Sequence, residues 1–136
     1  ATLRHPQRFE YLVDLAQAID TMAACRTLMC LTGHTHVPGV IEYDRIQRRL
    51  VRVLASAHEL AEISWSDEPG TRRYLLNPGS VGQPRDGDPR ASYAIIDTQR
   101  RSVSVHRVPY DVATAQRKIR AAGLPPFLAD RLAIGR

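Results

Sequence analysis

The order of the periodic segments constrains this chain most. Six short segments between residues 40 and 108 have the alternating or continuous apolar patterns that are typical of strands. They are, in order, "VIEYDR", "RLVRVLAS", "AEISWSD", "RRYLLN", "ASYAIIDT" and "RSVSVHRV". The last two are expected to form a hairpin, although the residues that join them are not the favoured Asn-Gly type. The middle of the chain is therefore predicted to be a sheet of mostly antiparallel strands.

Helices are predicted on both sides of this sheet. Residues 14–24 and 112–122 place apolar side chains at a spacing of 3.6 residues. These side chains are Leu15, Ala18, Ile19 and Met22 in the first helix, and Val112, Ala115, Ile119 and Ala122 in the second. Asp14 and Asp111 are the expected caps, and Gly123 is the expected stop. A last short helix, with proline at its start, is expected over residues 125–135.

A short apolar run, "TLMCL" at residues 27–31, follows the first helix and ends at a glycine. Its length and composition predict a buried strand. The order of helix, buried strand, antiparallel strands and helix predicts an α/β or α+β domain. The 136 residues suit one domain of ordinary size, which we place at residues 1–136.

The composition excludes several classes of protein. No apolar run approaches the ~20 residues of a membrane-spanning helix, and no signal peptide is visible. Two cysteines do not make a disulfide framework, so a cytoplasmic location is expected. The net charge of +5 comes almost entirely from arginines that are scattered along the chain. This scatter favours a solvated surface over a nucleic-acid interface.

The stretch "LTGHTHVP" at residues 31–38 carries the main chemical signal. In an extended or turn segment, His34 and His36 would face the same side, with imidazoles about 6–7 Å apart. That separation suits two metal ions about 3.5–4 Å apart, each with one nitrogen ligand. Gly33 would let the backbone turn sharply, and Pro38 would end the strand. A surface loop without metal is the plainer interpretation of the pair.

A structural zinc site is a competing interpretation of the same region. Cys25, Cys30, His34 and His36 could supply four nitrogen and sulfur ligands. Their spacing is poor for such a site, and both cysteines are better explained as thiols in the core.

A second constellation is the glycine- and proline-dense stretch "LNPGSVGQPRDGDPR" at residues 76–90. Asn77 and Gly79 are expected in a tight structural turn. Arg85 and Arg90 are candidates to clamp a phosphate group, with solvated side chains as the alternative.

Together these residues resemble a known family. "GHTHVPGV" followed by "LLNPGSVGQPRDGDPRASYAIID" is similar to the C-terminal half of calcineurin-like metallophosphoesterases, particularly the small phosphodiesterase-type members. The ending "VPYDVATAQRKIRAAGLPPFLADRL" and the early "RFEYLVD" resemble the same proteins. The resemblance implies an α/β fold, the C-terminal half of a four-layer α/β/β/α sandwich with mostly antiparallel strands and flanking helices.

The resemblance also implies a dinuclear metal site. Family members hold two divalent ions, with manganese the first expectation here and iron, zinc, nickel or cobalt as alternatives. By resemblance, His36 would bind the first metal and His34 the second. The family motifs D-x-H, G-D-x-x-D and G-N-H-D, which carry the other ligands and the catalytic histidine, have no counterpart here. The family's lone histidine would fall just before Ala1, with His5 as the only substitute.

The expected function is therefore metal-dependent hydrolysis of a phosphomonoester or phosphodiester, carried here by roughly half of an enzyme. The isolated chain is expected to be inactive and to bind metal weakly. The partner is expected to be a phosphate-ester small molecule or a nucleotide, with no membrane partner and with self-association through the exposed sheet face. A non-catalytic binding domain of the same fold and a basic nucleic-acid-binding domain are the alternatives.

Overall fold

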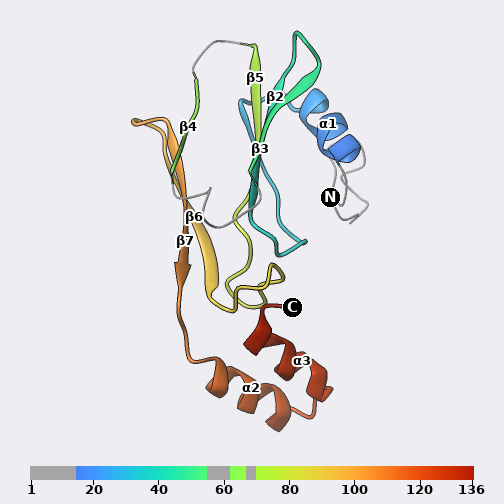
Figure 1. The fold of residues 1–136 in the computed structure, drawn as a ribbon, viewed down its shortest axis with the longest axis vertical. Helices are drawn as coiled ribbons and strands as arrows, with labels where there is room; N and C mark the ends of the chain where they lie inside the picture. The colour runs from blue at the N-terminus through green and yellow to red at the C-terminus, as the bar shows by residue number, and fades with distance from the viewer. Residues whose placement is uncertain (1–14, 55–61, 67–69) are drawn as a thin grey trace.

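The computed structural model describes residues 15–54, 62–66 and 70–136. In these residues two sheets form the body of the molecule, with three α-helices and one short 3-10 helix beside or beyond them (Figure 1). The elements are α1 Leu15–Ala24, β1 Met29–Leu31, β2 Gly39–Asp44, β3 Arg49–Leu54, β4 Ile63–Ser64, β5 Arg72–Asn77, β6 Ala91–Asp97, β7 Ser102–Val108, α2 Val112–Ala121, α3 Pro126–Asp130 and the 3-10 helix η1 Arg131–Ile134. The expectations for His5 and Asp14 lie outside the described residues.

The strands form a four-stranded sheet and a three-stranded sheet. In the large sheet the order is β1-β5-β2-β3, with β1 parallel to β5 and the other pairs antiparallel. In the small sheet the order is β4-β7-β6, and both pairs are antiparallel. The predicted α/β class with mostly antiparallel strands and flanking helices is confirmed, including the hairpin of β6 and β7.

Two apolar clusters hold the layers together. One cluster joins the two sheets and consists of Val40, Ile63, Leu76 and Val103. The other lies between α1 and the opposite face of the large sheet and consists of Ala18, Met22, Tyr43 and Leu75. The consecutive residues Leu75 and Leu76 of β5 thus face different clusters, as strand geometry requires. In the described residues, α1 and the two sheets form three successive layers, whereas α2 and α3 lie beyond the end of the sheets (Figure 1).

The strand predicted as buried, residues 27–31, is the main correction to the fold. The structure gives it only three residues, β1, at the edge of the large sheet. Leu31 is 61% exposed, and Met29 and Cys30 are half-buried. An edge strand has one neighbour only, so a continuous apolar run does not by itself establish burial. The central buried strand is β5, in which all five residues from Arg73 to Asn77 are buried.

The turns of the β2–β3 and β6–β7 hairpins are stabilised by the same kind of side-chain hydrogen bond. Asp44 accepts hydrogen bonds from the backbone N–H groups two and three residues on, at 2.9 Å each. Asp97 does the same at 2.9 and 2.8 Å. In each turn an arginine four residues after the aspartate is left-handed, Arg48 at φ 51° and Arg101 at φ 54°. The aspartate therefore replaces the Asn-Gly signal that both turns lack.

The C-terminal helices follow the predicted signals closely. Asp111 caps α2 by accepting from the Thr114 N–H at 2.9 Å, and Gly123 ends it at φ 69°. Val112, Ala115 and Ile119 of the predicted apolar face are half-buried, whereas Ala122 is exposed at the C-cap, and no residue of α2 is fully buried. The segment 125–135 forms α3 and then η1, with Gly135 left-handed at the end. No helix in the described ranges has both the length and the apolar character needed to cross a bilayer.

Candidate metal centre

Two loops meet beyond the ends of β1 and β5. The histidine loop, residues 32–38, connects β1 to β2, and the glycine-proline loop, residues 78–90, connects β5 to β6. Because β1 and β5 are parallel neighbours, their carboxyl ends lie at the same edge of the sheet. The Thr32 N–H continues the pairing by donating to the Leu76 carbonyl at 2.9 Å. This register brings Asn77 beside the two histidines.

Both histidines have left-handed backbones, with φ 76° at His34 and φ 61° at His36. Of the two backbone geometries expected from the sequence, the extended one is therefore wrong, and the segment turns at both histidines. A left-handed backbone costs about 1–2 kcal/mol for each L-residue, so contacts with neighbouring residues must stabilise it. Gly33, which was expected to make the sharp turn, has no positive φ, and a Cβ there would meet nothing within 4 Å. The turn is thus placed at the residues that carry the imidazoles.

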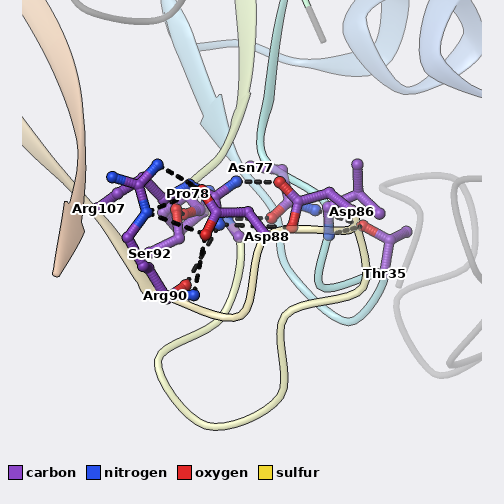
Figure 2. A network of polar contacts seen from close by, with 10 residues as sticks. Thr35, Asn77, Pro78, Asp86, Asp88, Arg90, Ser92 and Arg107 are labelled. Atoms are coloured by element: carbon purple, nitrogen blue, oxygen red, sulfur yellow. Dashed lines mark hydrogen bonds and ion pairs between the residues drawn. The ribbon is translucent and has the colours of Figure 1, made fainter. Parts of the chain in front are cut away.

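The Asn77 side chain makes some of the contacts that stabilise the left-handed backbone of the histidine loop. Its Nδ2 donates to the Thr35 hydroxyl at 2.7 Å and, more weakly, to the Gly33 carbonyl at 3.5 Å. Its Oδ1 accepts from the Gly79 N–H at 3.0 Å. Asn77 is buried at the end of β5, so one amide ties the middle of the His-Thr-His segment to the glycine-proline loop (Figure 2). The same contact fixes the Thr35 hydroxyl.

The imidazole of His36 is oriented by the glycine-proline loop. Its Nδ1 lies 2.8 Å from the Gln83 carbonyl, and the Arg85 N–H donates to the His36 carbonyl at 3.2 Å. A carbonyl only accepts, so this hydrogen bond requires a proton on Nδ1, and in the neutral imidazole that tautomer leaves the Nε2 lone pair for a metal. A backbone carbonyl on the second nitrogen is the arrangement expected for a metal-binding histidine. His34, by contrast, is an exposed residue.

Gly79 lets the glycine-proline loop pack closely against β6. Its φ is 85°, and an added Cβ would lie 2.8 Å from both Cβ and Oγ of Ser92. Ser92 is buried there because its hydroxyl donates to the Pro78 carbonyl at 2.7 Å and its N–H donates to the Ser80 carbonyl at 2.8 Å. The turn at residues 77–80 is therefore fixed from both sides.

The two candidate phosphate clamps have different surroundings. Arg90 is exposed, and its guanidinium forms an ion pair with Asp88 at 2.6 Å. Hydrogen bonds from Arg90 lower the pKa of Asp88 to about 2. Arg85 is half-buried and donates from Nη2 to the Gln83 side chain at 2.8 Å, while its buried Nε has no hydrogen-bond partner among the described residues. The Arg85 backbone thus contacts His36 while its side chain contacts Gln83, whereas the Arg90 guanidinium is paired with Asp88.

Within the described residues, the two cysteines do not gather with the histidines into a ligand set. Cys25 is buried, with its sulfur 3.2 Å from the Thr27 hydroxyl, and burial together with Cys25 raises the pKa of the Cys30 thiol. In the described ranges, no three His, Cys, Asp or Glu side chains gather as metal ligands. The zinc alternative built on Cys25, Cys30, His34 and His36 is therefore wrong. The histidine pair fits an ion only as part of a larger ligand set.

The comparison with known families identifies the chain. A model of the calcineurin-like phosphoesterase superfamily domain matches residues 2–101. The chain belongs to this superfamily. Its members are metallophosphoesterases, hydrolases that generally bind divalent metal ions. The resemblance inferred from the motifs is therefore confirmed at the level of the family.

Several relatives of this calcineurin-like phosphoesterase chain are longer than it is. MJ0912 of Methanocaldococcus jannaschii, an uncharacterized protein, is 35% identical over 136 residues, which is 100% of this chain and 50% of MJ0912. A metallophosphoesterase from Sphaerobacter thermophilus is 38% identical with a TM-score of 0.78, covering 100% of this chain and 53% of that structure. The hypothetical protein PH1004 of Pyrococcus horikoshii is 18% identical with a TM-score of 0.64, and the match covers 100% of this chain and 44% of that structure. At this identity the likeness supports the fold alone. The chain thus spans about half the length of these relatives.

Some contacts of the site were not predicted from the sequence. No sequence pattern indicated the contact of the Gln83 carbonyl with His36. The same is true of the contact between the Arg107 guanidinium and Asp86 in the glycine-proline loop. A backbone carbonyl has no sequence signature, and an arginine in a strand resembles any surface arginine. Asn77 before Pro-Gly was the one visible signal, and it predicted a turn rather than a contact with Thr35.

Proposed function

We propose that the protein containing this chain hydrolyses phosphate esters with a dinuclear metal site, and that His34 and His36 each donate one imidazole to it. Manganese is the first expectation for both ions. The observation that supports this best is the Nδ1 contact of His36 with the Gln83 carbonyl, because it leaves Nε2 free. The left-handed backbone at both histidines adds support, because strained residues cluster at functional sites.

The residues of this chain would bind and orient rather than transfer protons. When bound, two divalent ions polarise a phosphoryl group and lower the pKa of a bound water. Arg85 is half-buried in the glycine-proline loop, and its guanidinium would bind a phosphate oxygen of the substrate, since a guanidinium pairs well with phosphate. We propose a phosphodiester or phosphomonoester of a small molecule or nucleotide as the substrate.

The ligand set would be completed by residues outside this chain. Two neutral imidazoles do not offset the charge of two divalent ions, and carboxylates are the hard ligands that such ions need. The relatives are about twice as long, which leaves room for those ligands. The isolated 136-residue chain is therefore proposed to bind metal weakly and to lack phosphoesterase activity.

Hydrolysis of bis-p-nitrophenyl phosphate by the full-length protein, with and without Mn²⁺, tests this proposal. Activity should require the metal and should fall at least about 100-fold in His36→Ala, as expected for losing a metal ligand. His106→Ala is the matched control, because His106 lies on β7, stacked on Tyr93 at 5.1 Å between ring centroids. Full activity in His36→Ala, or in the isolated chain, would contradict the proposal. Absence of bound metal from the full-length protein would favour a non-catalytic binding domain.

A further inference from the structure

Arg107 places a largely buried charge against the glycine-proline loop (Figure 2). It belongs to β7 in the small sheet, and only 7% of its side chain is exposed. Its two terminal nitrogens donate to the two carboxylate oxygens of Asp86, with Nη1 at 3.4 Å. Nη1 also donates to the Arg90 carbonyl at 3.4 Å, and Nε lies 3.9 Å from Asp88 Oδ2. One guanidinium thus contacts three residues of the same loop.

The anchored part of the loop is continuous with the part that contacts His36. Gln83 accepts from Nδ1 of His36, and the N–H of Arg85 donates to the His36 carbonyl. Asp86 is the next residue along. Pro84, which lies within this stretch, is fully buried and has a fixed φ. The segment 83–86 is therefore a short, stiff link between the Arg107 guanidinium and the His36 imidazole.

The ion pair is better explained by positioning than by stability. A largely buried ion pair loses hydration that its mutual attraction only partly restores, so apolar residues of similar size often stabilise a fold as well. Its geometry is nevertheless specific, because Asp86 is only 12% exposed and receives both terminal nitrogens of the guanidinium. Such a pair fixes where the loop lies relative to the small sheet.

We propose that Arg107 is a positioning residue for His36. Through Asp86 it holds the segment 83–86 so that the Gln83 carbonyl keeps the His36 proton on Nδ1 and directs Nε2 toward the metal. This inference rests on the proposed role of His36 as a ligand. It assigns Arg107 no contact with metal or substrate.

The tautomer of His36 in the metal-free, full-length protein tests the proposal. Long-range ¹H–¹⁵N correlation spectra at about pH 8, where an ordinary imidazole is neutral, distinguish the two ring nitrogens directly. The wild type should show the proton on Nδ1 of His36. Arg107→Met and Asp86→Asn should each shift the population toward the Nε2–H form. Each should also weaken Mn²⁺ binding by about 10-fold, the lower end for losing an outer contact of a ligand histidine.

Arg72→Met is the matched control. Arg72 forms ion pairs with Asp44 at 3.3 Å and with Glu42 at 3.6 Å, but at the start of β5, opposite the end that carries the site. Its His36 tautomer should match the wild type. An unchanged tautomer in Asp86→Asn, which keeps Arg107, would overturn the proposal even if Arg107→Met failed to fold. A shifted tautomer together with a wild type that binds no metal would instead overturn the proposed function.

Discussion

Replacing Gly79 with alanine tests how closely the glycine-proline loop packs on β6. The new Cβ would lie 2.8 Å from Cβ and Oγ of Ser92 and 3.3 Å from Cβ of Pro38. Ser92 is only 2% exposed and bonded to the Pro78 carbonyl, so it has little room to retreat. The substitution also places an L-residue at φ 85°.

Two costs combine at this position. A left-handed backbone costs alanine about 1–2 kcal/mol. Overpacking against buried neighbours costs about 1–3 kcal/mol. Gly79→Ala should therefore lower the free energy of unfolding by about 2–5 kcal/mol, a large part of the ~5–15 kcal/mol of a typical domain.

Urea unfolding of the full-length protein, followed by circular dichroism, measures this loss. Gly87→Ala is the control, because Gly87 has nearly the same φ, 84°, and an added Cβ there would meet nothing within 4 Å. It should lose only the backbone cost, about 1–2 kcal/mol. The difference between the two variants isolates the clash with Ser92. Equal losses would refute the close packing described for this turn.

Three further results are expected. Thr35→Val removes the acceptor of the Asn77 amide at nearly constant volume and should cost about 1–3 kcal/mol in urea unfolding, whereas Thr35→Ser should cost much less. The pKa of Asp88 is lowered to about 2 from 3.8, so its ion pair stabilises the fold above about pH 4 and is lost as the pH falls toward 2. Asp88→Asn should therefore flatten that part of a stability-against-pH curve, and an unchanged slope would contradict the assignment. Burial raises the pKa of the Cys30 thiol from 9.0, so iodoacetamide should alkylate it more slowly than free cysteine at about pH 8, and equal rates would argue against burial.

Local signals in the sequence were sufficient for most of the fold. The segment "RRYLLN" coincides with β5, and Asp111 and Gly123 mark the ends of α2 as expected. These predictions depend on side-chain periodicity and capping, which act within a few residues. The edge position of β1 depends on which strands lie beside it, and a five-residue apolar run cannot encode that.

The candidate site was predictable in its residue types but not in its geometry. His34 and His36 were found from their spacing, yet their left-handed backbones depend on contacts with Asn77 and Gln83 some 40 or more residues away. Arg90 could not be separated from Arg85 by sequence, since only the structure shows that Asp88 engages Arg90. Long-range hydrogen bonds and ion pairs therefore decide what local patterns leave open.

The central claim is that His34 and His36 are ligands of two divalent ions. A crystal structure of the full-length protein grown with Mn²⁺, with anomalous data at the manganese edge, tests it most directly. Two anomalous peaks are expected, one within about 2.0–2.3 Å of His36 Nε2 and the other at the same distance from an imidazole nitrogen of His34. Peaks that lie away from both imidazoles, or a peak bonded to His36 through Nδ1, would contradict it.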